Sequence, residues 1–319
     1  MAEPDVAAPE DLIPASLHLA KDLAARMPDL LAEARTIANT VTAGWHGRRR
    51  AGPGETFWQF RSFGAGEPAK RIDWRRSARD EHLYVREKEW EAAHTVWLWA
   101  DRSRSMGFRS KLSETPKIER AAVLLLALAD LLGRSGERVG IPGLTLPVAD
   151  RRIAEQLTNA LIHDDKLATE PQLTQVRRFS DVILFGDFLD PFSDVSAFLD
   201  RLAETGATVH LVQILDPVEE TFPFSGRVEF RDPESGLKLV SGRAEAWGEG
   251  YRTRLAAHRD SIREICRRLD WTFILHHTDR PANEPLLLLH NRLGGLPLGQ
   301  RAMADTGSSG GASYGGSGL

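Results

Sequence analysis

Short apolar runs alternate along the chain with longer amphipathic segments. The runs carry β-branched and aliphatic residues at successive positions, a pattern typical of strands buried on both faces of a parallel sheet. The segments between them repeat their apolar residues at helical spacing. Strands that alternate with helices predict a three-layer α/β fold, with a mostly parallel central sheet and helices on both faces. The predicted strands are Thr95–Ala100, Arg138–Ile141, Leu144–Val148, Asp181–Gly186, Thr208–Leu215 and Trp271–His276, and the main predicted helices are Lys117–Arg134, Arg151–His163, Val195–Thr205 and Tyr251–Leu269.

The amino-terminal region has a different pattern. Apolar residues recur at near-helical spacing from Asp11 to Thr42 and predict one or two amphipathic helices, with Pro14 and Pro28 as breaks. We expect the apolar stripe to dock on the main domain, and recruitment of another protein is the alternative.

A basic segment follows, in which tryptophan and arginine are interleaved with acidic residues. Its alternating stretches predict short strands separated by glycine turns. Such a mixture can bind nucleic acid through stacking and phosphate contacts, and residues 48–86 would be the surface. We favour the alternative, in which the arginines pair with the neighbouring acids and the aromatic rings pack inside.

These patterns divide the chain into four parts. Residues 1–45 form a tail and amphipathic helices, and residues 46–93 form the basic segment with its short strands. Residues 94–295 form the α/β domain, with a hairpin inserted at about 222–240. Residues 296–319 are rich in Gly and Ser and are predicted to be a disordered tail.

Composition narrows the class of protein only moderately. The chain has 319 residues, 42% hydrophobic and 27% charged, with a net charge of −4, which gives no general reason to expect nucleic-acid binding. The single cysteine, Cys266, excludes an internal disulfide framework. We find no apolar stretch of the length needed to span a bilayer and no secretory signal pattern, and we expect a cytoplasmic protein.

Oxygen-bearing side chains follow two of the predicted strands. Asp101, Ser103 and Ser105 come directly after the first strand, and Asp187 comes directly after the strand at residues 181–186. Because the carboxyl ends of parallel strands meet at one edge of the sheet, these side chains should converge there. Oxygen ligands suit a hard cation such as Mg²⁺, with Mn²⁺ and Ca²⁺ as alternatives. The competing interpretation is that Asp101 and the serines only cap the following helix.

The sequence offers little support for catalysis. An aspartyl-phosphate hydrolase needs a second aspartate two residues after the first, where this chain has Ser103. We also find no Walker lysine loop, no Gly-x-Ser-x-Gly elbow, and no third ligand for His276 and His277. We therefore expect a protein that is not an enzyme and has no small-molecule substrate, and keep a Mg²⁺-dependent hydrolase as the alternative.

The Asp101-x-Ser103-x-Ser105 loop and the strand that ends in Asp187 resemble a von Willebrand factor A domain. The upstream run Arg71-Ile-Asp-Trp-Arg-Arg-Ser-Ala-Arg79 resembles the signature of domain-of-unknown-function family 58, which carries such a segment before an A-type domain. The resemblance covers roughly residues 46–289. Two features depart from the family pattern: the aspartate of the third loop follows Gly186 instead of serine, and the threonine loop lacks a flanking glycine.

The resemblance implies a metal-ion-dependent adhesion site and a role as an interaction module. Asp101, Ser103, Ser105, Asp187 and a threonine would hold Mg²⁺, with Thr169 as the best match and Thr174 as the alternative. A partner's Asp or Glu would supply the last ligand. Relatives are often encoded beside MoxR-type AAA+ ATPases, which makes such an ATPase, or its client, the expected partner.

Overall fold

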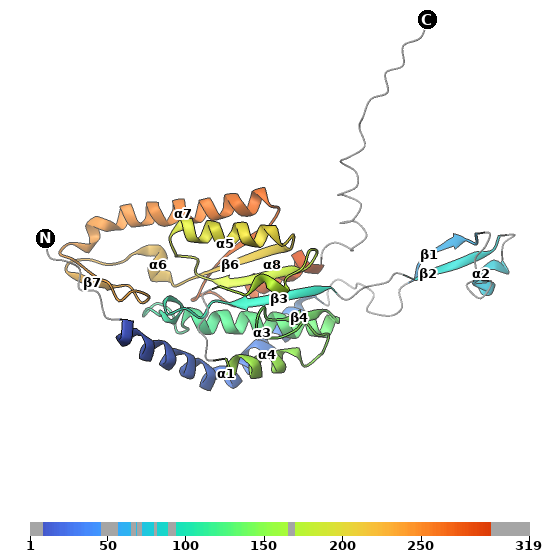
Figure 1. Ribbon diagram of the computed structural model, residues 1–319, viewed down its shortest axis with the longest axis horizontal. Coiled ribbons are helices and arrows are strands. Elements are labelled where there is room, and N and C mark those ends of the chain that lie inside the picture. The colour runs from blue at the N-terminus through green and yellow to red at the C-terminus, as the bar shows by residue number, and fades with distance from the viewer. Residues whose placement is uncertain are drawn as a thin grey trace, which may run out of the picture.

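The computed structural model describes residues 9–45, 57–64, 68, 72–79, 82–88, 94–164 and 170–294 (Figure 1). The predicted Gly/Ser-rich tail at residues 296–319 lies outside these residues, as does Thr169. Most of the basic segment's side chains are outside them as well.

Five parallel strands form the central sheet, as the pattern predicts. They are β3 (Thr95–Ala100), β4 (Arg138–Gly140), β5 (Asp181–Gly186), β6 (Thr208–Leu215) and β9 (Thr272–His277). Their order across the sheet is β4-β3-β5-β6-β9, and every neighbouring pair is parallel. The α/β fold with a parallel central sheet is therefore confirmed.

Helices cover both faces of this sheet (Figure 1). In β3, Val96 and Leu98 join the core beneath one face, while Trp97 and Trp99 join the core beneath the other. The first face is covered by α3 (Lys117–Ser135), α4 (Ile153–Ile162) and α8 (Asn283–Gly294), and the second by α5 (Phe192–Glu204) and α7 (Gly248–Arg268). Because apolar side chains point to both faces, the strands show no polar alternation in the sequence.

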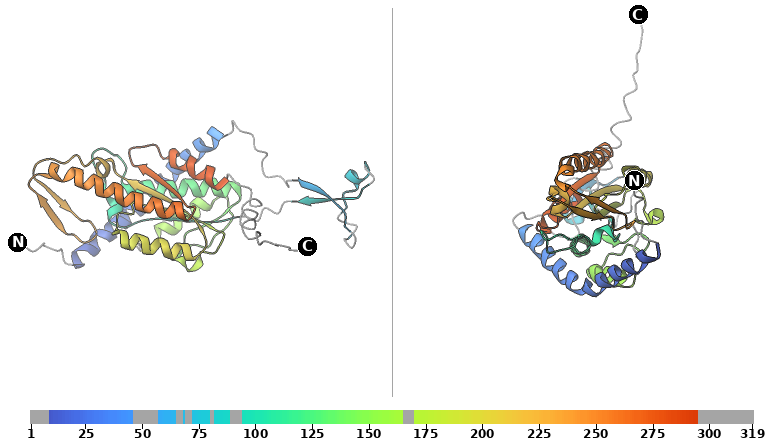
Figure 2. Two further views of the ribbon diagram at one scale, coloured as in Figure 1. Left: turned by 90° about the horizontal axis from the view of Figure 1, so that it is seen from above. Right: turned by 90° about the vertical axis from the view of Figure 1, so that its left-hand side faces the viewer.

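The helix α1 (Pro9–Trp45) adds a further layer outside α3 (Figures 1 and 2). Its residues Met27, Leu30 and Ala34 are almost completely buried in the core shared with α3 and α4. The expectation that the stripe docks on the main domain therefore holds for this chain. The predicted breaks at Pro14 and Pro28 are wrong, because the helix continues through both prolines; burial of the stripe outweighs the local cost of proline.

The prediction of a strand at Leu144–Val148, next to β4, is also wrong. Residues 144–148 form no strand, and only one antiparallel bridge joins Val148 to Val139. Pro147 removes a backbone donor at this position, which leaves the segment unable to continue the ladder.

Two small hairpins complete the described structure. The first pairs β1 (Phe57–Ser62) with β2 (Tyr84–Lys88) and carries the short helix α2 (Trp74–Ser77). The second pairs β7 (Val228–Arg231) with β8 (Lys238–Ser241) and falls within the predicted insertion. It follows α6 (Pro217–Thr221) and precedes α7.

The short helix α2 shows a structural use for the upstream motif. The Asp73 side chain caps α2 by accepting a hydrogen bond from the Arg76 backbone N–H at 3.0 Å. Ser77 Oγ donates to the Asp73 carbonyl and accepts from the Tyr84 backbone N–H, both at 2.9 Å, which ties α2 to β2. Trp74 remains exposed, and Arg71 lies outside the described residues.

Candidate metal centre

The candidate site lies where the direction of the sheet connections changes. After β3 the chain crosses to β4 on one side, whereas β5 pairs with β3 on its other side. At such a switch point the loops that follow the two strands diverge and leave room for a ligand. Asp101 follows β3 and Asp187 follows β5, so that both carboxylates stand at this point.

The loop after β3 is held by its own side chains. Asp101 Oδ1 accepts a hydrogen bond from the Ser103 backbone N–H at 2.8 Å, and the hydroxyls of Ser103 and Ser105 are 3.0 Å apart. The turn η2 (Ser105–Gly107) follows directly. Asp101 and Ser103 are buried, while Ser105 is half-buried. The loop therefore gathers one carboxylate and two hydroxyls within a few ångströms.

The neighbouring loop joins this group through Asp187. Ser105 Oγ donates a hydrogen bond to Asp187 Oδ2 at 2.9 Å. The Asp187 carbonyl accepts from Gln213 Nε2 at 2.8 Å, which fixes the loop from β6. The structure thus brings together four of the five predicted ligands, Asp101, Ser103, Ser105 and Asp187.

Glycine at position 186 has a steric explanation. A Cβ added to Gly186 would lie 3.2 Å from Asp101 Cβ and 3.6 Å from Asp101 Oδ2. The strands β3 and β5 are in direct register here, because Ala100 pairs with Phe185. The close approach of the two aspartate loops leaves little room for a side chain at position 186.

A buried lysine, which the sequence analysis missed, completes the polar network. Lys117 Nζ donates to Asp187 Oδ2 at 2.8 Å and to Glu219 Oε1 at 2.6 Å, and its side chain is 1% exposed. Glu219 belongs to the capping box of α6, in which its Oε2 accepts from the Asp216 backbone N–H at 2.8 Å. The sequence did contain one indication of this role. Lys117 is a cation in the first turn of a helix, where the helix dipole disfavours positive charge, so that a nearby anion would stabilise it.

The charges of this network are unevenly balanced. Burial would lower the pKa of Lys117, but the carboxylates of Asp187 and Glu219 hold it above its usual value, so that the ammonium stays charged. Burial and the charge of Asp187 raise the pKa of Asp101 to about 7, although hydrogen bonds from Ser103 act in the opposite direction. Asp187 thus has a nearby cation, whereas Asp101 lies beside a like charge.

This donor set fits a hard divalent cation. Among the described residues, no three His, Cys, Asp or Glu side chains are grouped so that they could hold a metal ion. A cation here would therefore need the hydroxyls of Ser103 and Ser105 in addition to the carboxylates of Asp101 and Asp187, and all of these ligands are oxygens. Burial and the charge of Asp187 both disfavour the ionised form of Asp101, and a bound cation would favour it.

The threonine ligand is not part of this group as described. Thr169, the preferred candidate, lies outside the described residues. Thr174, the alternative, is exposed in the turn η3 (Leu173–Gln175). The fifth ligand stays a prediction.

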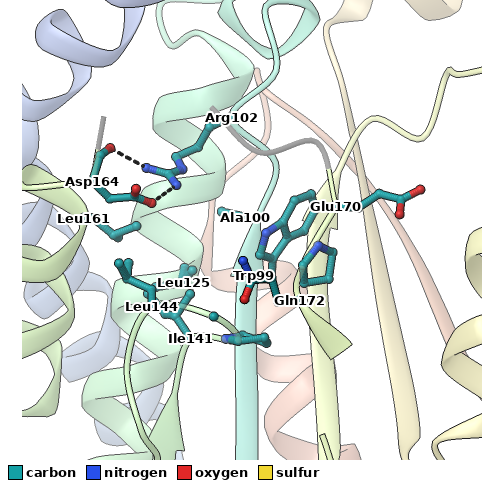
Figure 3. A pocket seen from close by; sticks show the side chains of 13 residues that line it. Trp99, Ala100, Arg102, Leu125, Ile141, Leu144, Leu161, Asp164, Glu170 and Gln172 are labelled. Carbon is teal, nitrogen blue, oxygen red and sulfur yellow. Dashed lines mark hydrogen bonds and ion pairs between the residues drawn. The ribbon is translucent and has the colours of Figure 1, made fainter. Parts of the chain in front are cut away.

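The two arginines that flank the serines have different roles. Arg102 is buried and forms an ion pair with the Asp164 side chain, and its Nη1 donates to the Asp164 carbonyl at 3.2 Å (Figure 3). Arg102 therefore anchors the loop and does not face a partner. Arg104 instead reaches across to the inserted hairpin, where its Nη1 donates to the Glu234 carbonyl at 3.3 Å.

A cavity of about 180 Å³ lies beside Arg102, between the carboxyl ends of β3 and β4 (Figure 3). Its walls combine polar and apolar groups: Trp99, Ile141 and Leu161 are among the apolar residues, and Arg102 and Asp164 are paired at its edge. The cavity thus adjoins the loop of the candidate site on the side away from Asp187.

Together, the fold and the site define an α/β protein with an oxygen-lined candidate metal centre at the switch point of its sheet. The chain belongs to the family described as Protein of unknown function DUF58, whose model matches residues 59–261. That span includes most of the small hairpin unit, the candidate site and the inserted hairpin.

The chain is also similar to uncharacterized proteins and, at low sequence identity, to solved structures. Uncharacterized proteins of Mycobacterium bovis and Mycobacterium tuberculosis are 25% identical over 279 residues, which cover 79% of this chain and 86% of theirs. An aerotolerance-related membrane protein from Bacteroides fragilis matches with a TM-score of 0.40 and 16% identity. BatB from Bacteroides thetaiotaomicron matches with a TM-score of 0.38 and 14% identity. Each match covers 64% of this chain and 100% of the solved one.

Within the described part of the chain, no helix combines the length and the apolar character required to cross a bilayer.

Proposed function

We propose that this protein is a non-enzymatic interaction module that binds an acidic side chain of a partner protein through a divalent cation. The observation that carries the proposal is the convergence of Asp101, Ser103, Ser105 and Asp187 at the switch point of the sheet. Mg²⁺ is the expected ion, with Mn²⁺ and Ca²⁺ as alternatives.

Each residue of the site would have a different role. When bound, the cation supplies the Lewis-acidic contact for an incoming carboxylate. Asp101 and Asp187 provide negative charge, and the two serine hydroxyls provide neutral oxygens, so that the site keeps capacity for an anionic ligand. Lys117 neutralises part of the Asp187 charge and fixes its orientation. Thr169 would complete the ligand set.

We further propose a MoxR-type AAA+ ATPase, or its client, as the partner that offers this Asp or Glu. The support is the resemblance of the sequence to a family whose members are often encoded beside such ATPases. In this role the protein would act as an adaptor or co-factor in the cytoplasm, and it would have no small-molecule substrate.

The alternatives have weaker support. A Mg²⁺-dependent hydrolase would need an acid/base group near Asp101, and position 103 carries a serine whose hydroxyl is 3.0 Å from that of Ser105. Nucleic-acid contact through residues 48–86 would depend on side chains that lie largely outside the described residues.

Capture of partners from native lysate tests the proposal. Wild type, Ser103→Ala and the matched surface control Ser193→Ala would be used as baits, each in Mg²⁺ and in EDTA; Ser193 is exposed on α5. We expect wild type and Ser193→Ala to retain an ATPase in Mg²⁺ only, and Ser103→Ala to retain none. Equal capture by all three proteins in both buffers would overturn the proposed function.

A further inference from the structure

The inserted hairpin places a carboxylate of this same chain on the loop of the candidate site. Glu234, at the tip between β7 and β8, accepts a hydrogen bond at its Oε1 from the Ser105 backbone N–H at 2.8 Å. The neighbouring Arg104 donates to the Glu234 carbonyl at 3.3 Å. Glu234 and Ser105 are 129 positions apart in the sequence, so the contact depends on the tertiary fold.

Hydrogen bonds within the hairpin fix the conformation of the turn at its tip. Asp232 Oδ1 accepts from the Glu234 backbone N–H at 3.0 Å, and the Asp232 carbonyl accepts from the Gly236 N–H at 2.9 Å. These bonds form a compact turn that presents the Glu234 side chain. Because the turn is organised locally, the glutamate loses little conformational entropy when it meets Ser105.

The contact lies on a residue that belongs to the site. Ser105 donates its backbone N–H to Glu234 and its hydroxyl to Asp187 Oδ2. Burial and the charges of Asp187 and Glu234 raise the pKa of the nearby Asp190. A carboxylate at this place is disfavoured unless hydrogen-bond donors or a cation compensate for burial and the neighbouring charges.

The strands and the tip of the hairpin are held very differently. In β7, Phe230 stacks on Phe222 and on Trp247, with ring centroids 5.6 Å and 6.0 Å apart, and Tyr251 of α7 packs on Phe222 at 4.8 Å. At the tip, solvent-exposed hydrogen bonds from Ser105 and Arg104 join the turn to the site loop. Exposed hydrogen bonds of this kind are weak, so the turn at residues 232–237 can lift while the aromatic contacts of Phe230 stay in place.

We propose that the hairpin tip is a built-in ligand of the candidate metal centre. The Glu234 carboxylate occupies the place that the acidic side chain of a partner takes, and the partner binds by displacing it. This inference rests on the proposed function for its metal, but the contact between Glu234 and Ser105 exists without one. It also specifies the partner's binding element: an exposed turn with a central acidic residue, like the tip itself.

The chain's own hairpin is the probe that tests this inference. A fluorescent peptide of residues 228–241, closed into a ring by a disulfide between added terminal cysteines, would be titrated against the full chain by anisotropy in Mg²⁺. The test protein is Glu234→Ala. The matched control is Glu229→Ala, which removes an exposed glutamate from β7 of the same hairpin.

We expect the peptide to bind Glu234→Ala about tenfold more tightly than wild type or Glu229→Ala, because the internal competitor is gone. A peptide that carries alanine in place of Glu234 should bind none of the three. Equal affinity for all three proteins, or equal binding of the alanine peptide, would overturn the inference.

Two further measurements separate this inference from the proposed function. If the tighter binding to Glu234→Ala persists in EDTA, the built-in ligand stands and the metal in the proposed function fails. Hydrogen exchange supplies a readout that does not depend on the peptide. The Ser105 amide should exchange faster in Glu234→Ala than in Glu229→Ala, and unchanged exchange would contradict the inference.

Discussion

Lys117 is the residue on which the electrostatics of the site depend most. Its ammonium is 1% exposed and lies between the carboxylates of Asp187 and Glu219, at 2.8 Å and 2.6 Å. A buried charge is tolerated only when its partners are present, and here each of the three groups needs the others.

Replacement of Lys117 by methionine should therefore be costly. The change keeps most of the side-chain volume but leaves Asp187 and Glu219 without their shared cation, and we expect a loss of about 3–5 kcal/mol in the free energy of unfolding. Urea denaturation measures this loss. Lys111→Met, at an exposed position, is the matched control and should change stability by less than about 0.5 kcal/mol. Equal effects of the two changes would mean that the Lys117 network contributes nothing.

The buried residue His276 should make the stability of the protein depend on pH. His276 is buried in β9, and its Nε2 has no hydrogen-bond partner in the described structure. Burial, together with the positive charges of Arg120 and His277, lowers its pKa to about 3. The folded protein therefore holds His276 neutral, whereas the unfolded chain takes up a proton below its ordinary pKa of 6.5.

The sign of the effect follows from this difference. The stability that neutral His276 maintains is fully present above about pH 6.5 and is lost as the pH falls toward 3. His276→Leu should unfold with a shallower loss of stability over this range than wild type, as measured by urea midpoints at a series of pH values. His163→Gln, at an exposed position, should retain the wild-type slope. An unchanged slope in His276→Leu would show that another group is responsible.

At the scale of elements, α1 shows what a sequence pattern can predict and what it cannot. Its apolar stripe was evident from the spacing, because Met27, Leu30 and Ala34 recur on one face. The continuity of α1 could not be predicted from the sequence, because proline normally ends or kinks a helix. The local rule fails at Pro28 because Met27 and Leu30, which lie before and after it, are held by tertiary packing against α3 and α4.

Truncation of the stripe should measure how firmly α1 is docked. Leu30 is 1% exposed, so Leu30→Ala removes buried methyl groups and should lower the free energy of unfolding by about 2–5 kcal/mol. Asp29→Asn, next to it on the exposed face, should have little effect. If Leu30→Ala matched this control in urea unfolding, α1 would not be packed on the domain in solution.

The strands were predictable for a simple reason. A parallel strand is buried on both faces, and it therefore appears as a compact apolar run that needs no knowledge of its neighbours. The same reasoning failed for residues 144–148, where the composition suits a strand but Pro147 cannot donate to a ladder. Their single bridge to β4 shows how much pairing the segment retains.

At the scale of the whole molecule, the site depends on how distant segments are brought together. Asp101, Ser103, Ser105 and Asp187 were predictable because each directly follows a recognisable strand, and strand ends meet at one edge of a parallel sheet. Lys117, Glu219 and Glu234 were not, because they reach the site from a helix start, a helix cap and a hairpin tip. Lys117 and Glu219 are 102 positions apart, and no local pattern encodes that contact.

The proposed function requires a divalent cation at the switch point of this sheet. Isothermal titration calorimetry of Mg²⁺, with Mn²⁺ as a second ion, measures such binding for wild type, Ser103→Ala and the surface control Ser193→Ala. We expect one saturable site in wild type and in Ser193→Ala, and binding weakened at least about tenfold in Ser103→Ala. Absence of saturable binding in wild type, or equal binding in all three proteins, would contradict the proposed function.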